Sequence, residues 1–137
     1  MSSCFFALPI VAYISLALEN DKSAAFDSVQ EYCRHTSVET DIFAEEILPQ
    51  AKERPLWQKV LNLVDCNEVS MIVVPSLNHI AGRDSKSLFS FLNLLKIKSV
   101  RLKSLAEGID SQRDSHLKIL WHLDQENSHH RIAKNQH

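Results

Sequence analysis

The stretch that decides the fold runs from residue 69 to residue 110 and reads VSMIVVPSLNHIAGRDSKSLFSFLNLLKIKSVRLKSLAEGID. It divides into an apolar β-branched run, a polar turn with a glycine, an amphipathic segment and a second β-like run: Val69–Val74, Ser76–Arg83, Asp84–Leu95 and Ser99–Leu105. This order of strand, loop, helix and strand builds parallel sheets through a right-handed crossover. Sites in such sheets lie beyond the carboxyl ends of the strands. We therefore expect functional residues on the rim formed by residues 77–83.

The rest of the chain continues the alternation. Its apolar spacing predicts further strands over Ile10–Leu16 and Asp41–Ile47, and further helices over Ala24–Cys33, Arg54–Val64 and Ser115–Asn127. The resulting βαβαβαβα order predicts an α/β fold, a three-layer, mostly parallel β-sheet flanked by helices, with a C-terminal helix. We expect residues 1–111 to form the α/β domain, and residues 112–137 to form the C-terminal helix and a polar tail.

Length and composition are those of an ordinary globular protein. The 137 residues are 45% apolar and 23% charged, which predicts one core of useful size. The net charge of −2 gives no electrostatic case for nucleic acid, whose partners carry a basic surface. The three cysteines stand scattered at positions 4, 33 and 66, which predicts reduced thiols and a cytoplasmic location.

The N-terminal segment Cys4–Leu18 is almost entirely apolar and has two interpretations. It lacks the positively charged start of a signal peptide, and it is too short to span a membrane. Continuous apolar runs also characterise the central strands of parallel sheets, which are buried on both faces. We favour a buried strand and expect no membrane partner.

Four short motifs lie where predicted strands end or a predicted helix begins: Tyr13-Ile14-Ser15-Leu16-Ala17, Glu53-Arg54-Pro55, Leu77-Asn78-His79-Ile80-Ala81-Gly82-Arg83-Asp84 and Ala106-Glu107-Gly108-Ile109-Asp110. In order and spacing they resemble the catalytic domain of the serine recombinases, the resolvase/invertase family. That family has Tyr-x-Arg-x-Ser at the end of its first strand and an arginine, often followed by proline, at its second helix. Leu-Asp-Arg-Leu-x-Arg follows its third strand, and Gly-Ile-Asp or a similar sequence follows its fourth. The resemblance covers residues 10–126.

The resemblance implies DNA strand exchange, in which a serine hydroxyl attacks a phosphodiester and forms a covalent phosphoserine link. Clustered arginines hold the phosphate in such a reaction, because guanidinium groups bind its oxygens in a bidentate way and stay charged. Arg54 and Arg83 fall on two of these arginines. The resemblance implies no cofactor and no metal ion.

The chain departs from the family pattern at the positions that carry the chemistry. The family serine falls on Ala17, and the arginine two residues earlier falls on Ser15. The Asp-Arg pair after the third strand falls on Asn78 and His79, and a family glutamine falls on Asp21. Loss of the nucleophile alone costs about a millionfold in a covalent enzyme. We therefore predict that the domain is catalytically inactive.

Ser15 and His79 each have two interpretations. Ser15 could act as a displaced nucleophile, but it lies about 6.6 Å back along the strand from Ala17, too far for a reaction that needs accurate placement. We favour a buried, hydrogen-bonded serine. His79 titrates near neutrality and could carry partial positive charge, but we favour a surface loop histidine.

The two retained arginines also have structural alternatives to a phosphate contact. Arg54 could pair with Glu53 or Glu45 at the start of its helix. Arg83 could pair with its neighbour Asp84. The sequence leaves both alternatives open.

The C-terminal end holds five of the seven histidines: His116, His122, His129, His130 and His137. On a helix, His122, Glu126 and His129 or His130 share one face that could bind zinc, but we favour a solvated helix end and expect no metal. The apolar block around Trp121 fits the family's dimerisation helix and predicts a homodimer or a heterodimer. No helix-turn-helix module follows it, so we expect a truncated chain with weak, non-specific DNA binding.

Two classes of function stay open. The first is a serine-recombinase domain of site-specific DNA recombination that has lost its catalytic apparatus, as a relic or an accessory of a mobile-element recombinase. The second is a non-enzymatic α/β protein-interaction module unrelated to DNA. Salt-sensitive DNA binding favours the first class over the second.

Overall fold

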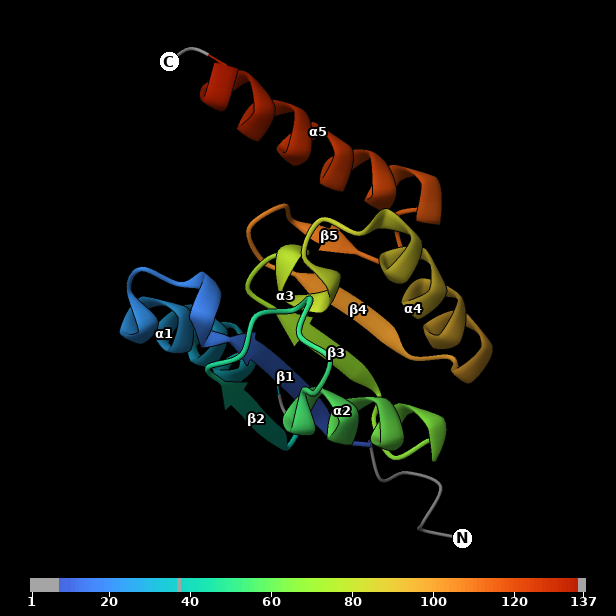
Figure 1. The fold of residues 1–137 in the computed structure, drawn as a ribbon. Helices are drawn as coiled ribbons and strands as arrows, with labels where there is room; N and C mark the ends of the chain where they lie inside the picture. The colour runs from blue at the N-terminus through green and yellow to red at the C-terminus, as the bar shows by residue number, and fades with distance from the viewer. Residues whose placement is uncertain (1–7, 37, 136–137) are drawn as a thin grey trace, which may run out of the picture.

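The computed structural model describes the backbone of residues 8–36 and 38–135, and the side chains of these residues as far as residue 125. Strands and helices alternate along the chain, as Figure 1 shows. The elements are β1 Ile10–Ser15, the 3-10 helix η2 Leu16–Leu18, α1 Lys22–Arg34, β2 Thr40–Glu45, α2 Pro55–Asp65, β3 Met71–Val74, α3 Asn78–Ala81, α4 Ser85–Lys98, β4 Arg101–Ser104, β5 Ile109–Asp110 and α5 His116–Asn135.

The strands form one five-stranded sheet in the order β2-β1-β3-β4-β5. The first four strands are parallel, and Ile10 lies opposite both Thr40 and Met71. β5 runs antiparallel to β4, so β2 and β5 form the two edges. The strand order reverses beside β1, because β2 lies on one side of it and β3 on the other. Sheets of this topology generally bind ligands beyond the carboxyl ends of the two strands at which the order reverses, which here are β1 and β3.

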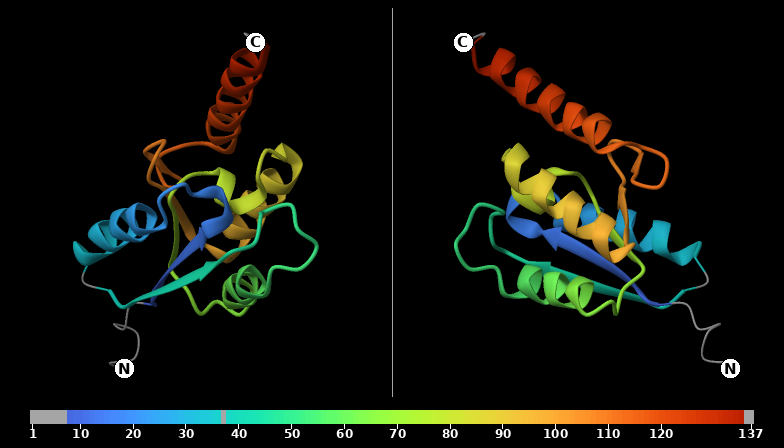
Figure 2. Two further views of the ribbon diagram at one scale, coloured as in Figure 1. Left: turned by 60° about the vertical axis from the view of Figure 1, so that its left-hand side comes forward. Right: turned by 90° about the vertical axis from the view of Figure 1, so that its right-hand side faces the viewer.

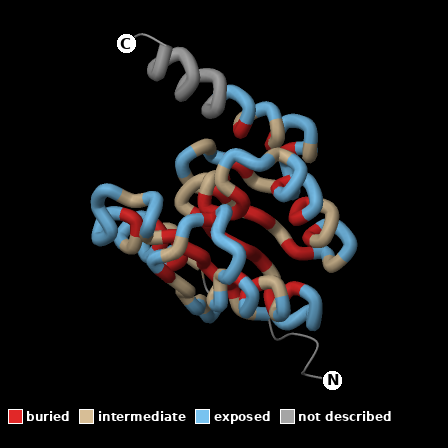
Figure 3. Tube along the Cα trace, in the orientation of Figure 1, coloured by how far each residue is buried: buried red, intermediate tan, exposed pale blue. Residues whose placement is uncertain are grey.

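Alternating side chains of the central strands pack into two separate cores. Ile10, Ala12 and Ile14 of β1 pack with α1, whereas Val11 and Tyr13 pack with α2 and α4. Figures 1 and 2 show α1 on one face of the sheet and α2 and α4 on the other. Every residue of β1 is buried, and so is every residue of its neighbour β3 (Figure 3). The edge strand β2 is mostly half-buried. Residues 10–15 of the N-terminal apolar run therefore form a central strand, as predicted.

The predicted α/β class and mostly parallel sheet are confirmed, and most boundaries agree within two residues. The polar turn predicted over Ser76–Arg83 is wrong, because its middle forms the short helix α3. Leu77 and Ile80 on this segment are buried, so the segment folds onto the core that faces α2 and α4. The sequence prediction also missed β5, which follows Gly108 at a positive φ of 66°.

The last helix, α5, continues to Asn135, well beyond its predicted end at Asn127. Its first half packs against the domain through Ile119 and Leu123, and the helix then extends away from the sheet in Figures 1 and 2. Leu117 and Trp121 on the same half are exposed. Within residues 8–36 and 38–135, no helix combines the length and the apolar composition that crossing a bilayer requires.

Candidate functional site

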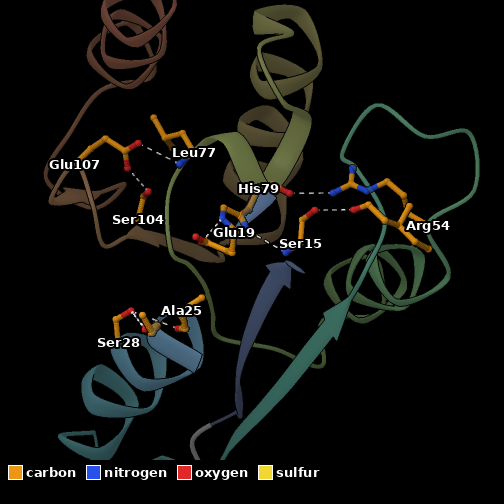
Figure 4. Close-up of polar contacts among 11 residues, drawn as sticks. Ser15, Glu19, Ala25, Ser28, Arg54, Leu77, His79, Ser104 and Glu107 are labelled. Atoms are coloured by element: carbon orange, nitrogen blue, oxygen red, sulfur yellow. Dashed lines mark hydrogen bonds and ion pairs between the residues drawn. The ribbon is translucent and has the colours of Figure 1, made fainter. Parts of the chain in front are cut away.

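A hydrogen bond between Ser15 and His79, two of the predicted site residues, joins the carboxyl end of β1 to the segment that follows β3. The backbone N–H of Ser15, the last residue of β1, donates to Nδ1 of His79 at 2.9 Å. His79 lies on α3, which follows β3. The two residues are 64 positions apart in the sequence, and Figure 4 shows them side by side on the rim. The structure therefore brings Ser15 and His79 together on the rim of the sheet, where the sequence predicted functional residues.

Ser15 is a buried structural serine, as predicted. Its side chain is 0% exposed, and its Oγ donates to the carbonyl oxygen of Ile47 at 2.6 Å. This bond ties the end of β1 to the segment that follows β2. Two residues later, Ala17 lies in η2 and is exposed. Ala17, the predicted nucleophile position, therefore faces solvent and presents a methyl group, while the nearest hydroxyl along the strand is buried.

The prediction of a surface loop histidine at position 79 is wrong, because the side chain is only 2% exposed. The Ser15 amide can only donate, so Nδ1 must accept and carries no proton. The proton of the neutral ring is therefore on Nε2, which donates to Oε1 of Glu19 at 3.0 Å. Burial lowers the pKa of His79, and the attraction of Glu19 opposes that shift only in part. His79 is thus neutral near pH 7.

Arg54 uses its guanidinium group to hold α3 in place. Its two terminal nitrogens donate to the carbonyl oxygens of Ile80 at 2.8 Å and of His79 at 2.9 Å. Its Cζ lies 4.8 Å from the ring centroid of Trp57 and 5.3 Å from that of Tyr13, within the range of cation–π attraction. The guanidinium therefore clamps α3 through backbone carbonyls, a role that the sequence did not indicate.

Glu45, one of the predicted partners of Arg54, caps α2. Its carboxylate accepts the backbone N–H groups of Leu56 and Trp57, both at 3.1 Å, and the hydroxyl of Tyr13 at 2.6 Å. A carboxylate at this position satisfies otherwise unpaired N–H groups and complements the helix dipole. Burial and the bond to Glu45 raise the pKa of Tyr13 far above its ordinary value. Tyr13 is therefore a hydrogen-bond donor at any working pH.

A third carboxylate, Glu107, lies on the rim beyond β4. It accepts the backbone N–H of Leu77 at 3.2 Å and the hydroxyl of Ser104 (Figure 4). Together with Glu19 and Glu45 it makes the rim rich in negative charge. Sequence reasoning missed the role of both Glu19 and Glu107. Glu19 lies outside the four motifs, and Glu107 lies inside the fourth one, where nothing in the sequence indicated that its carboxylate bonds Leu77 and Ser104.

The remaining predicted positions lie around α3 and at the C-terminal end. Asn78 is half-buried on α3, and Arg83 is exposed on the turn before α4. Asp84, the predicted partner of Arg83, caps α4 by accepting from the N–H groups of Lys86 and Ser87. Asp21 caps α1 in the same way.

The zinc hypothesis cannot be followed on the structure beyond His122, because the side chains of Glu126, His129 and His130 lie outside the described residues. Among the side chains that are described, no group of three His, Cys, Asp or Glu residues is placed to hold a metal ion.

We expect Arg54→Lys to lower the free energy of unfolding by about 1.5–3 kcal/mol, because a single ammonium cannot replace a fork that bonds two carbonyls. Urea titration measures the change. Arg83→Lys is the matched control, because Arg83 is an exposed arginine near the same rim, and we expect a change within about 0.5 kcal/mol. Equal losses in both variants would contradict the clamp.

The sequence matches the family model "Resolvase, N terminal domain" over residues 17–134. The structure is similar to the N-terminal catalytic domain of TP901-1 integrase, with a TM-score of 0.68 and 17% identity over 91% of this chain and 98% of that chain. A resolvase family site-specific recombinase from Streptococcus pneumoniae gives a TM-score of 0.66 and 18% identity over 94% of each chain. The catalytic domain of ISC1926 TnpA, an IS607-like serine recombinase, gives 0.58 and 13% over 72% and 70%. No curated protein sequence matches significantly.

These comparisons confirm the resemblance that the four motifs suggested. At such low identities the solved structures establish the shared fold, whereas the family model establishes membership because it matches most of the chain. The placement of the family arginine and serine on Ser15 and Ala17 stays a prediction. The chain belongs to the resolvase family of serine recombinases, which serve site-specific recombination, and corresponds to its N-terminal domain.

Proposed function

We propose that this resolvase-family domain does not cleave DNA and acts as a relic or an accessory of a mobile-element recombinase. The observation that carries the proposal is the pair of residues at the end of β1. Ala17 presents a methyl group to solvent at the family nucleophile position, and the Ser15 hydroxyl is buried and bonded to Ile47. Phosphoryl transfer to protein needs an exposed, activated nucleophile, because the oxygen must reach the phosphorus atom.

The charges around the rim support the same proposal. His79 stands where the family has an arginine, and it is neutral near pH 7 and bonded to Glu19. The terminal nitrogens of Arg54 are engaged by carbonyl oxygens of α3. Glu19 and Glu107 add negative charge to the same edge of the sheet. Transition-state stabilisation in phosphoryl transfer depends on positive groups aimed at the phosphate oxygens. Here His79 is neutral and Arg54 is engaged elsewhere, so fewer positive groups are available.

The exposed face of α5 supports a protein partner. Leu117 is 78% and Trp121 is 55% exposed, on a helix that extends away from the sheet (Figure 2). Neighbouring exposed apolar side chains of this size are typical of protein interfaces, in which tryptophan is enriched. We propose a homodimer, or a heterodimer with an active recombinase, formed through this helix. Any DNA binding by the domain itself is weak and non-specific, and the site of action is cytoplasmic.

The test of cleavage is incubation of the purified protein with a supercoiled plasmid that carries the DNA flanking its gene. We expect neither nicks nor protein-linked DNA ends, whereas an active resolvase on its own site gives both. Ala17→Ser alone should not restore cleavage, because Ser15, Asn78 and His79 also differ from the family pattern. A covalent DNA adduct of the unmodified protein would refute the proposal, and recovery in Ala17→Ser would refute the predicted loss of the phosphate clamp.

The test of pairing is sedimentation of the protein over a range of concentrations, alone and with a related active recombinase. We expect Trp121→Ser to weaken association by at least about tenfold, because truncation of a central aromatic side chain typically costs 2 kcal/mol or more, on the order of a thirtyfold change. Leu48→Ser is the matched control, because Leu48 is also an exposed apolar residue but lies between β2 and α2. Equal effects of the two substitutions would rule out α5 as the interface.

A further inference from the structure

His79 is a buried titratable side chain, and the proposed function gives no role to a change in its protonation state. Its ring lies between one group that needs a hydrogen-bond acceptor and one that needs a donor. The Ser15 amide needs an unprotonated Nδ1, whereas the Glu19 carboxylate accepts the proton on Nε2. Both nitrogens of the neutral ring therefore have hydrogen-bond partners. A change in the protonation state of His79 must change its contact with Ser15 or with Glu19.

Proton uptake by the ring would break one of these contacts and keep the other. The second proton has to go to Nδ1, which lies 2.9 Å from the Ser15 nitrogen, and two N–H donors would then face each other. The contact with Glu19 would become an ion pair, because Nε2 keeps its proton and the ring gains a positive charge. Protonation therefore releases the backbone N–H of Ser15 and holds Glu19, while the Ser15 hydroxyl keeps its bond to Ile47.

The surrounding contacts determine which side of the broken bond moves. On the His79 side, Arg54 holds α3 through two carbonyl oxygens. On the other side, the Ser15 amide leads directly into η2, in which no residue is buried. The segment Leu16–Leu18 thus lies between one contact that breaks and one that strengthens. Leu16 is half-buried against the core that faces α1, whereas Ala17 and Leu18 are exposed.

We infer that His79 makes η2 a proton-sensitive element, so that acidification detaches Leu16–Leu18 from the rim while Glu19 stays bound to the imidazolium. This segment carries Ala17, the family nucleophile position. The inference rests on the geometry around His79 and is independent of whether the domain cleaves DNA.

The charged groups that face His79 come from three different segments. Glu19 after η2 and Glu107 in the turn between β4 and β5 favour the imidazolium, whereas Arg54 before α2 disfavours it. Burial is the largest influence and lowers the pKa of His79 below the ordinary value of histidine. The transition is therefore expected on the acid side of neutrality.

The test is amide hydrogen exchange followed by NMR on the full chain, with the ring of His79 titrated in the same samples. Between about pH 7.5 and about pH 5, we expect the protection factor of the Ser15 amide to fall at least about tenfold, which corresponds to the loss of one hydrogen bond. The fall should follow the His79 titration. Amides of Ala12 and Val73 in the central strands should keep their protection. Unchanged protection at Ser15 while His79 takes up its proton would overturn the inference.

Two variants separate a switch from a merely structural histidine. His79→Asn keeps an acceptor near the Nδ1 position but cannot take up a proton, so the Ser15 transition should disappear. Glu19→Gln removes the carboxylate that stabilises the imidazolium, so the midpoint of the transition should move to lower pH. A transition that persists in His79→Asn, or acid unfolding at the same pH in both proteins, would overturn the inference. If His79→Asn does not fold, an unshifted midpoint in Glu19→Gln overturns it.

Discussion

Trp57→Ala is expected to lower the free energy of unfolding by about 3–5 kcal/mol, the range for truncation of a large buried aromatic side chain. Trp57 is 8% exposed and connects three elements of the structure. Its ring lies 4.9 Å from the ring centroids of both Tyr13 on β1 and Phe91 on α4, and the Arg54 guanidinium stacks on it. Removal of the indole therefore leaves a cavity between the sheet and two helices and also exposes the clamp on α3.

The chain offers a matched control for this prediction, because it contains only two tryptophans. Trp121 is 55% exposed on α5, so Trp121→Ala should change the free energy of unfolding by no more than about 0.5 kcal/mol. Urea unfolding has to be measured at a concentration at which the chain is monomeric, because pairing through α5 would add stability. Fluorescence of the remaining tryptophan reports each transition. Similar losses in the two variants would contradict the role given to Trp57.

Glu45→Ala is expected to cost about 3 kcal/mol or more, because it removes three hydrogen bonds to one carboxylate. The variant leaves the first N–H groups of α2 and the buried hydroxyl of Tyr13 without their acceptor. A buried polar group left unsatisfied costs about 1–3 kcal/mol. Adding Tyr13→Phe to Glu45→Ala should therefore recover about 1 kcal/mol, because it removes the orphaned hydroxyl.

The control for Glu45 is the next residue in the chain. Glu46 carries the same carboxylate, but its side chain is 62% exposed and pairs with the exposed Lys22. A surface ion pair of this kind contributes at most about 1 kcal/mol, so Glu46→Ala should be nearly neutral. Thermal or urea unfolding of both variants measures the difference. A loss of similar size at Glu46 would mean that the local charge, rather than the cap on α2, sets the stability.

The fold could be predicted because its signals are local. The apolar run of β1 and the 3.6-residue spacing in α2 and α4 depend on neighbours in the sequence, and the structure confirms them. The assignment of the family nucleophile position to Ala17 also came from a local motif, and it stays a prediction. By contrast, the burial of His79 depends on contacts with Ser15 and Glu19, which lie 64 and 60 residues away. No local pattern encodes contacts of that range.

The role of Arg54 was unpredictable for a different reason. Its partners are backbone carbonyl oxygens of α3, and every residue carries a carbonyl. The sequence therefore suggested the side-chain partners Glu53 and Glu45, whereas the carboxylate of Glu45 serves the start of α2. Residues 76–83 were predicted as a polar turn, so α3 was not predicted. Without that helix, the carbonyl oxygens that bind the Arg54 guanidinium could not be identified.

The position of β2 at one edge of the sheet has a consequence for the behaviour of the protein in concentrated solution. β2 pairs with β1 on one side only, so the outer side of this six-residue strand presents backbone donors and acceptors to extended peptides. Natural proteins discourage fibril-like stacking at such strands with charged side chains. The exposed Asp41 supplies that protection here. Neutralising this one residue would leave the chain prone to aggregate from its folded state.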